Sequence, residues 1–122
     1  AGRTLEETRP VTITPITRGH RGESAPVARK FGRAKAQQAL FTMAQNMMER
    51  GLLQSKHVCF SYSGAVADIG AQPGYKELLG AAKKHNAQVH LVPMSVTGSV
   101  NVGPNALALG VIASDHQVDS LL

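Results

Sequence analysis

The sequence predicts an α/β fold in which a β-hairpin is followed by strand–helix–strand units that form a mixed sheet packed by helices. The first observation is a pair of segments, 33–50 and 73–86, whose apolar residues recur at helical spacing. The second is a set of short apolar or β-branched runs on either side of these segments. The third is size, because 122 residues that are 43% apolar are enough for one domain with its own core.

The hairpin is expected near the start of the chain. Val11–Ile16 alternates β-branched residues, which is typical of a strand, and Pro10 and Pro15 favour an edge position. Residues 17–24 are rich in turn-forming types, and Pro26–Phe31 is the expected return strand.

The first helix is predicted at Arg33–Arg50. Its apolar stripe includes Met43 and Met47, and Gly51 is placed to end the helix in the left-handed conformation. Met side chains fill irregular apolar space, so these two residues have two open interpretations, ordinary core packing and the adaptable wall of an acyl pocket.

The predicted sheet continues with His57–Tyr62, an apolar run expected to be a buried strand and followed by a small-residue loop at 63–74. The second helix should begin near Pro73 and end near Asn86, after a stripe of Tyr75, Leu78, Leu79 and Ala82. Gln88–Pro93 then alternates into a third strand that is also expected to be buried.

The most informative stretch runs from Pro93 to Ser114. It begins as a hydroxyl-rich loop of small residues, which leaves room for a ligand and offers N–H and O–H donors, and it continues into a strand-like segment, Ala106–Ile112. Gly98 and Gly103 are five residues apart with no Lys-Ser/Thr pair after them, so the loop lacks the pattern of a nucleotide phosphate loop.

Charge and composition bear on which partners the chain could bind and on whether it crosses a membrane. The formal net charge is +5, and residues 1–35 account for it, with eight Lys and Arg against three Glu. A basic front end attracts nucleic acid, anionic membranes or acidic proteins, but Phe31 is the only aromatic residue there, so nucleic-acid binding is not expected. The sequence has no apolar run of about 18 residues and no visible signal peptide, so neither a membrane span nor export is expected.

A set of residues that could form a catalytic or metal site is not expected either. No two histidines share a helix at a spacing of four, and no Cys or carboxylate completes a metal set. Cys59 lies in an apolar run and is expected to be a structural thiol, and Ser63 lacks a nucleophile-elbow motif. The chain is therefore expected to be no enzyme, to use no cofactor and to bind no metal.

Four stretches, taken in order, resemble the DegV family of bacterial fatty-acid-binding proteins. Gly103-Pro-Asn-Ala-Leu-Ala-Leu-Gly110 looks like the family's closing Gly-Pro-Gly-Ala-Leu-Gly-Leu segment. Arg9-Pro-Val-Thr-Ile-Thr-Pro15 looks like the Lys-Pro-Ile/Val strand that opens the family's second lobe, and Gly22 to Val27 corresponds to its hairpin. Phe31-Gly-Arg-Ala-Lys-Ala36 looks like its Arg-Gly-Arg-x-Lys-Ala helix start.

The resemblance implies the second, C-terminal lobe of a two-lobed protein, without the N-terminal lobe. Residues 1–8 would form a flexible lead, 9–114 the DegV-like lobe and 115–122 a tail. In the family, a His two residues before the closing Gly-Pro helps to hold the ligand carboxylate, and that position here is Asn101. The family's first motif Arg corresponds to Phe31.

The resemblance also implies a function, that of a cytoplasmic, non-catalytic carrier that presents the carboxylate of a fatty acid or similar lipid to a separate fatty-acid kinase. The ligand-binding residues would then be Arg33, Thr97, Ser99, Asn101 and Gly103 at the head group, and Met43 and Met47 along the acyl chain. The alternative is a regulatory or interaction domain that has lost the head-group site and uses its basic face for an acidic protein or nucleic acid.

Overall fold

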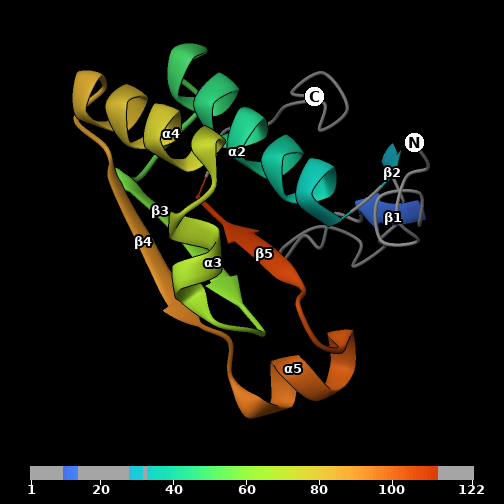
Figure 1. The fold of residues 1–122 in the computed structure, drawn as a ribbon. Helices are drawn as coiled ribbons and strands as arrows, with labels where there is room; N and C mark the ends of the chain where they lie inside the picture. Colours follow the sequence, from blue (N-terminus) through green and yellow to red (C-terminus); the bar gives the residue numbers. More distant parts are fainter. Residues whose placement is uncertain (1–9, 14–27, 32, 113–122) are drawn as a thin grey trace, which may run out of the picture.

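The computed structural model describes residues 10–13, 28–31 and 33–112 (Figure 1). Their elements follow one another as β1 (Pro10–Ile13), β2 (Ala28–Phe31), α2 (Arg33–Glu49), β3 (His57–Tyr62), α3 (Val66–Gly70), α4 (Pro73–Lys84), β4 (Gln88–Pro93), α5 (Val96–Val102) and β5 (Leu107–Gly110). The expected α/β class is confirmed. The expected lead at 1–8, the hairpin turn at 17–24 and the tail at 115–122 lie outside the described residues.

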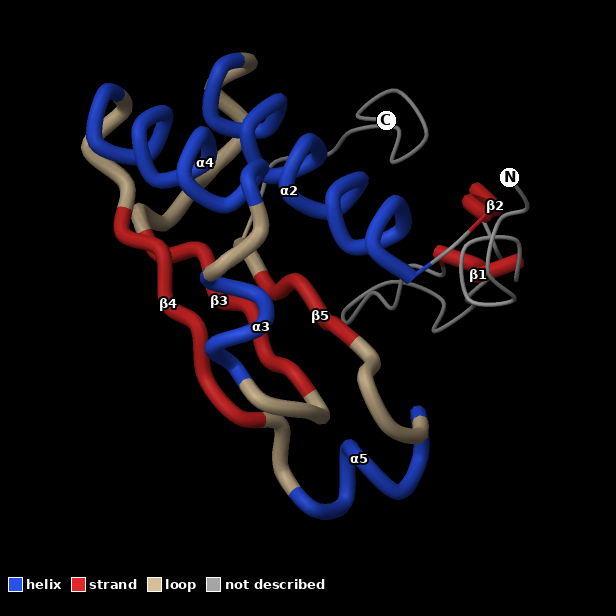
Figure 2. Tube along the Cα trace, in the orientation of Figure 1, coloured by secondary structure: helices blue, strands red, loops and turns tan. Residues whose placement is uncertain are grey.

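The described strands form two sheets, and each matches a prediction. β1 and β2 pair antiparallel as the expected hairpin, with Pro10 opposite Phe31 and Ile13 opposite Ala28. The second sheet has the order β4-β3-β5, in which β3 is parallel to β4 and antiparallel to β5 (Figure 2). The sheet is therefore mixed in direction, as the strand–helix–strand pattern predicted.

Two helices end as their sequences predicted. At the end of α2, Gly51 has a φ of 66°, the Leu52 N–H donates to the Met47 carbonyl at 3.0 Å and the Gly51 N–H to the Met48 carbonyl at 3.1 Å. These two bonds define a Schellman motif, which satisfies carbonyls that the helix end leaves free.

The end of α4 repeats this arrangement with an asparagine. Asn86 takes a φ of 56°, and the Ala87 N–H donates to the Ala82 carbonyl at 2.8 Å. Asn tolerates this left-handed conformation better than most residues with a side chain. At the other end, Pro73 occupies the first turn after the N-cap residue Gln72, where a missing N–H costs nothing.

The expected loop at 63–74 is wrong in part, because it contains α3. The Asp68 N–H donates to the Ala65 carbonyl at 3.0 Å and the Ala71 N–H to the Ala67 carbonyl at 3.1 Å. Ile69 is fully buried, so its packing fixes a turn that is too short to show a helical period. The connection from β3 to α4 is therefore a compact helical segment.

The expected burial of Gln88–Pro93 is also wrong. β4 lies at an edge of the sheet, and its side chains alternate between exposed and half-buried until the last two, which are both exposed. An edge strand has a neighbour on one side only, so its apolar residues stay partly open to solvent. The central strand β3 buries Val58, Phe60 and Tyr62 and turns the alternate residues to the other face.

The core lies between one face of this sheet and the helices. Phe60 of β3 and Phe41 of α2 meet edge to face, with ring centroids 5.5 Å apart, and Phe41 meets Tyr75 of α4 at 5.7 Å. Burial raises the pKa of the Tyr75 phenol above its usual 10.0. The buried residues of this cluster are Phe41, Ala44, Met48, Val58, Phe60, Tyr62, Ile69, Leu78 and Ala82.

The opposite face of the sheet is largely open. The side chains that alternate with the core residues include His57, His90, Ala108 and Ile112, and all four are exposed. Leu79, which the sequence placed in the apolar stripe of α4, is also exposed. Among the described residues, no helix is both long and apolar enough to cross a bilayer.

Candidate functional site

The candidate site lies where β3 ends. After β4 the chain forms α5 and then β5. The segments directly before and after α5 are hydrogen-bonded to Tyr62, the last residue of β3, and to Ser63, the residue that follows it. Before α5, the Met94 N–H donates to the Tyr62 carbonyl at 2.8 Å. After α5, the Ser63 hydroxyl donates to the Gly103 carbonyl at 2.7 Å. α5 is therefore held at the carboxyl end of β3, where α/β folds commonly place ligands.

Ser63 holds the turn between α5 and β5 in place through its hydroxyl group. Its hydroxyl also accepts a bond from the Ala106 N–H at 2.7 Å, so one side chain bonds the backbone on both sides of Pro104-Asn105. Its own backbone extends the β3–β5 pairing, because the Ser63 N–H donates to the Ala106 carbonyl at 3.0 Å and the Asn105 N–H to the Ser63 carbonyl at 3.2 Å. The Gly103–Ala106 turn is thus fixed to the end of β3.

Tyr62 and Gly64 complete this anchor. The Tyr62 hydroxyl donates to Asn105 Oδ1 at 3.2 Å, and Asn105 has a φ of 58°. A Cβ at Gly64 would stand 2.7 Å from Asn105 Oδ1 and 2.8 Å from the Tyr62 ring, which is closer than atoms pack. The Tyr62-Ser63-Gly64 sequence and the closing segment therefore fit one another, and glycine is needed at the third position.

The small-residue loop expected at 95–103 is wrong in part, because Val96–Val102 forms the helix α5. The Ser99 N–H donates to the Ser95 carbonyl at 2.9 Å and the Gly103 N–H to the Ser99 carbonyl at 2.8 Å. Three β-branched valines, a Thr and a Gly give this segment low helix propensity, which explains the expectation of a loop. Gly103, with a φ of 82°, ends the helix.

α5 extends beyond the ends of the strands, away from α2 and α4 (Figure 1). Val96 and Val100 lie one helical turn apart and are 82% and 78% exposed. These two side chains give α5 a small apolar face that is open to solvent.

The structure brings together part of the predicted binding set. Thr97, Ser99 and Asn101 all belong to α5, and Gly103 follows it directly. Thr97 is exposed and Ser99 half-buried, while the side chain of Asn101 lies outside those described. Arg33 begins α2, whose described contacts include the hairpin strands β1 and β2, and its side chain is likewise not described.

Met43 and Met47 lie elsewhere, in an apolar cluster between α2 and β5. They are buried, and they pack with Leu52, Leu109 and Val111 among others. The sequence predicted the apolar stripe of α2 correctly, and its two methionines pack against β5 and the residue after it.

A hollow between α2 and α4 is lined by other residues, including Gln38, Thr42 and Glu77.

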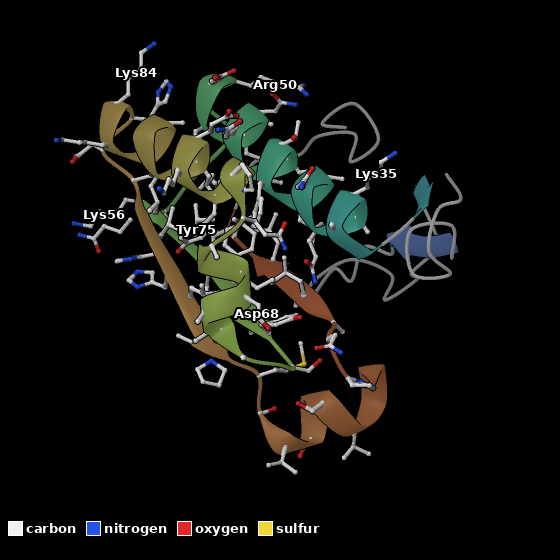
Figure 3. All side chains as sticks on the ribbon, in the orientation of Figure 1. Lys35, Arg50, Lys56, Asp68, Tyr75 and Lys84 are labelled. Atoms are coloured by element: carbon white, nitrogen blue, oxygen red, sulfur yellow. The ribbon has the colours of Figure 1, made fainter. Side chains whose placement is uncertain are left out.

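The described side chains at this site include one with a clear structural role, Ser63. All three hydrogen bonds of the Ser63 hydroxyl involve backbone groups of Gly103 and Ala106, so that side chain positions a turn. Within the described ranges, no three His, Cys, Asp or Glu side chains converge as a metal site. Most of the basic stretch at 1–35 lies outside the described residues, although Lys35 is exposed on the first turns of α2 (Figure 3).

Replacing Ser63 by Ala should destabilise the protein by about 1–3 kcal/mol, because the Gly103 carbonyl and the Ala106 N–H each lose their partner. We expect faster amide hydrogen exchange at Ala106 and in α5 than in α2. The control is Ser61→Ala, two residues earlier and on the open face of the sheet, which should change stability by less than about 0.5 kcal/mol. Equal effects of the two substitutions would contradict the anchoring role.

The position of Ser63 is the part of the site that sequence reasoning missed. In the sequence, Ser63 was only a serine without a nucleophile-elbow motif, and a hydroxyl that bonds the backbone of two residues 40 and 43 positions away has no local signature. The available signal was the small pair Ser63-Gly64 directly after a strand, because such residues allow another backbone to approach closely.

Comparisons with known proteins agree on one family. Residues 10–114 match the family described as uncharacterised proteins of the DegV family. A DegV domain-containing protein of Xanthomonas axonopodis pv. citri is 38% identical over 104 residues, and one of Xanthomonas campestris pv. campestris is 36% identical over 104 residues. Each match covers 85% of this chain and 33% of the relative, so the chain spans about a third of the length of these relatives. No solved structure matches the chain significantly.

Proposed function

Because the chain belongs to the DegV family, we propose that it is the second lobe of a non-catalytic carrier that binds a fatty acid or a similar lipid. The family match covers residues 10–114, which include the whole of the described helical layer and both sheets. The closing Gly103–Gly110 segment, one of the four stretches that carry the resemblance, is the segment that Ser63 anchors to β3.

This anchor is the observation that carries the proposal. It fixes both ends of α5 at the carboxyl end of β3, so hydroxyl and amide side chains are concentrated where a head group would bind. Thr97 and Ser99 offer O–H donors, and Asn101 offers an amide N–H₂. A carboxylate accepts such bonds, and Arg33 would add positive charge to the head-group site.

The acyl chain would extend from this head-group site along β5. β5 is an edge strand of its sheet, and its four residues span about 13 Å between the α5 end and the methionine cluster. Met43 and Met47 are flexible, polarisable side chains that can rearrange around an apolar ligand. The two halves of the predicted binding set would thus contact opposite ends of one lipid.

The proposal also covers the cellular compartment and the partners of the carrier. The carrier would act in the cytoplasm, and it would present the bound carboxylate to a separate fatty-acid kinase, which supplies the catalytic groups. The outward valines of α5 would contact the other lobe and close the head-group site from that side.

The test is native mass spectrometry of the chain joined behind the first lobe of the Xanthomonas relative and purified from bacteria. We expect a co-purified mass in the range of a fatty acid, and less of it with this chain alone, because the isolated lobe leaves the apolar face of α5 in water. The absence of any lipid in the joined protein, together with salt-sensitive retention on nucleic acid, would favour the interaction domain with a basic face instead.

A further inference from the structure

The open face of the sheet carries a pair of histidines that the proposed lipid site does not use. His57 is the first residue of β3 and His90 lies within β4, so both are close to the amino ends of parallel strands. His57 Nδ1 lies 3.0 Å from His90 Nε2, and the ring centroids are 5.2 Å apart. Both side chains are exposed, and the α5 anchor lies at the other end of β3.

The strands explain why the two rings meet. His57 stands opposite Gln88 in the parallel register, and His90 stands opposite Cys59, so the two histidines are diagonal neighbours on one face. Side chains that are diagonal across two strands are within reach of each other when they are long or aromatic. The register of the two strands therefore sets the separation of the rings.

We propose that His57 and His90 form a two-histidine site for a divalent transition-metal ion of the Ni²⁺ or Cu²⁺ type. Neutral imidazole nitrogens are ligands that these ions prefer, whereas Mg²⁺ and Ca²⁺ take oxygen ligands. An ion about 2.0–2.1 Å from each nitrogen would subtend an angle of roughly 91–97° between nitrogens 3.0 Å apart. That angle is close to the right angle of square-planar and octahedral coordination, in which water supplies the remaining ligands.

The ion would link the edge strand β4, through His90, to the central strand β3, through His57. Without metal, one ring N–H donates to the other ring, and with metal both nitrogens present lone pairs to the ion. Because the ion would bind the folded pair and not two distant residues of an unfolded chain, the melting temperature should rise with metal concentration. Cys59 lies on the same face, and the two-histidine site does not require its sulfur.

The test is a titration of the purified protein with Ni²⁺ at pH 7.5, where imidazoles bind metal in their neutral form. It is followed by NMR broadening of the His ring signals and by thermal unfolding. We expect the rings of His57 and His90 to broaden first, well before that of His85, which is exposed at the end of α4. His57→Asn and His90→Asn should each weaken binding by about tenfold or more, because a second ligand held nearby acts at high effective concentration.

The double variant separates chelation from independent binding. If one ion bridges the pair, His57→Asn and His90→Asn each keep one imidazole and should bind Ni²⁺ there only as weakly as a single histidine such as His85, while the double variant should bind none at this place. The matched controls His85→Asn and Cys59→Ser should bind Ni²⁺ at this pair as the unchanged protein does. Unchanged affinity in either single variant, or rings that broaden no sooner than His85, would overturn the site. Neither result bears on lipid binding at α5, so the two proposals can fail separately.

Discussion

Replacing Phe60 by Ala should cost about 3–5 kcal/mol of folding free energy. Phe60 lies in the central strand β3 and is fully buried, and its ring packs edge to face against Phe41 of α2. The substitution leaves a cavity between sheet and helices and removes an aromatic contact that contributes beyond its buried area. Domains of this size are stable by about 5–15 kcal/mol in total, so a large part of the native stability should be lost.

Urea unfolding followed by circular dichroism measures this loss. Phe60→Leu keeps most of the volume and should fall between Ala and the unchanged protein. Val96→Ala is the surface control, since Val96 is exposed on α5, and it should change stability by less than about 0.5 kcal/mol. If Phe60→Ala proved no more harmful than Val96→Ala, the helices would not pack on this face of the sheet.

The sequence predicted the elements whose signals are local and repeated. The stripe that contains Met43 and Met47 spans four turns of α2, and Gly51 and Asn86 mark helix ends that the structure confirms. α3 and α5 were missed because five and seven residues are too few to show a period. The first is fixed by the burial of Ile69, and the second is held at both ends by hydrogen bonds to Tyr62 and Ser63, which are far away in the sequence.

Strand burial and site assembly were less predictable, because both depend on residues far apart in the chain. Gln88–Pro93 has the composition of a buried strand, and only the order β4-β3-β5 shows that it lies at an edge. The contact between His57 and His90 follows from strand register, which a single sequence does not reveal. The closing motif was recognised from its residues, whereas its anchor at Ser63 required the structure.

Changing Asn101 to His should raise the affinity of the joined two-lobed protein for a fatty-acid carboxylate by roughly five- to tenfold. Asn101 belongs to α5, two residues before Gly103, where the family has its carboxylate-binding His. An amide donates a neutral hydrogen bond, whereas a protonated imidazole adds a charge-assisted bond of about 1.5–3 kcal/mol. The two kinds of bond differ by about 1–1.5 kcal/mol, which gives the expected range at about 1.4 kcal/mol for each tenfold change in affinity.

Titration with a fluorescent fatty acid at pH 6 and pH 8 measures the gain and its origin. The advantage should be largest at pH 6 and should shrink at pH 8, because histidine loses its charge between these values and a neutral ring keeps only an ordinary hydrogen bond. Gln54→His is the control, since it places the same ring on an exposed position that is bonded to Ile112, at the other end of β5 from α5. It should leave the affinity nearly unchanged if position matters as well as charge. Equal affinities for Asn101→His and the unchanged protein at pH 6 would mean that this turn of α5 does not meet the head group. An equal gain from Gln54→His would mean that any added positive charge suffices, and the specific role of position 101 would be lost.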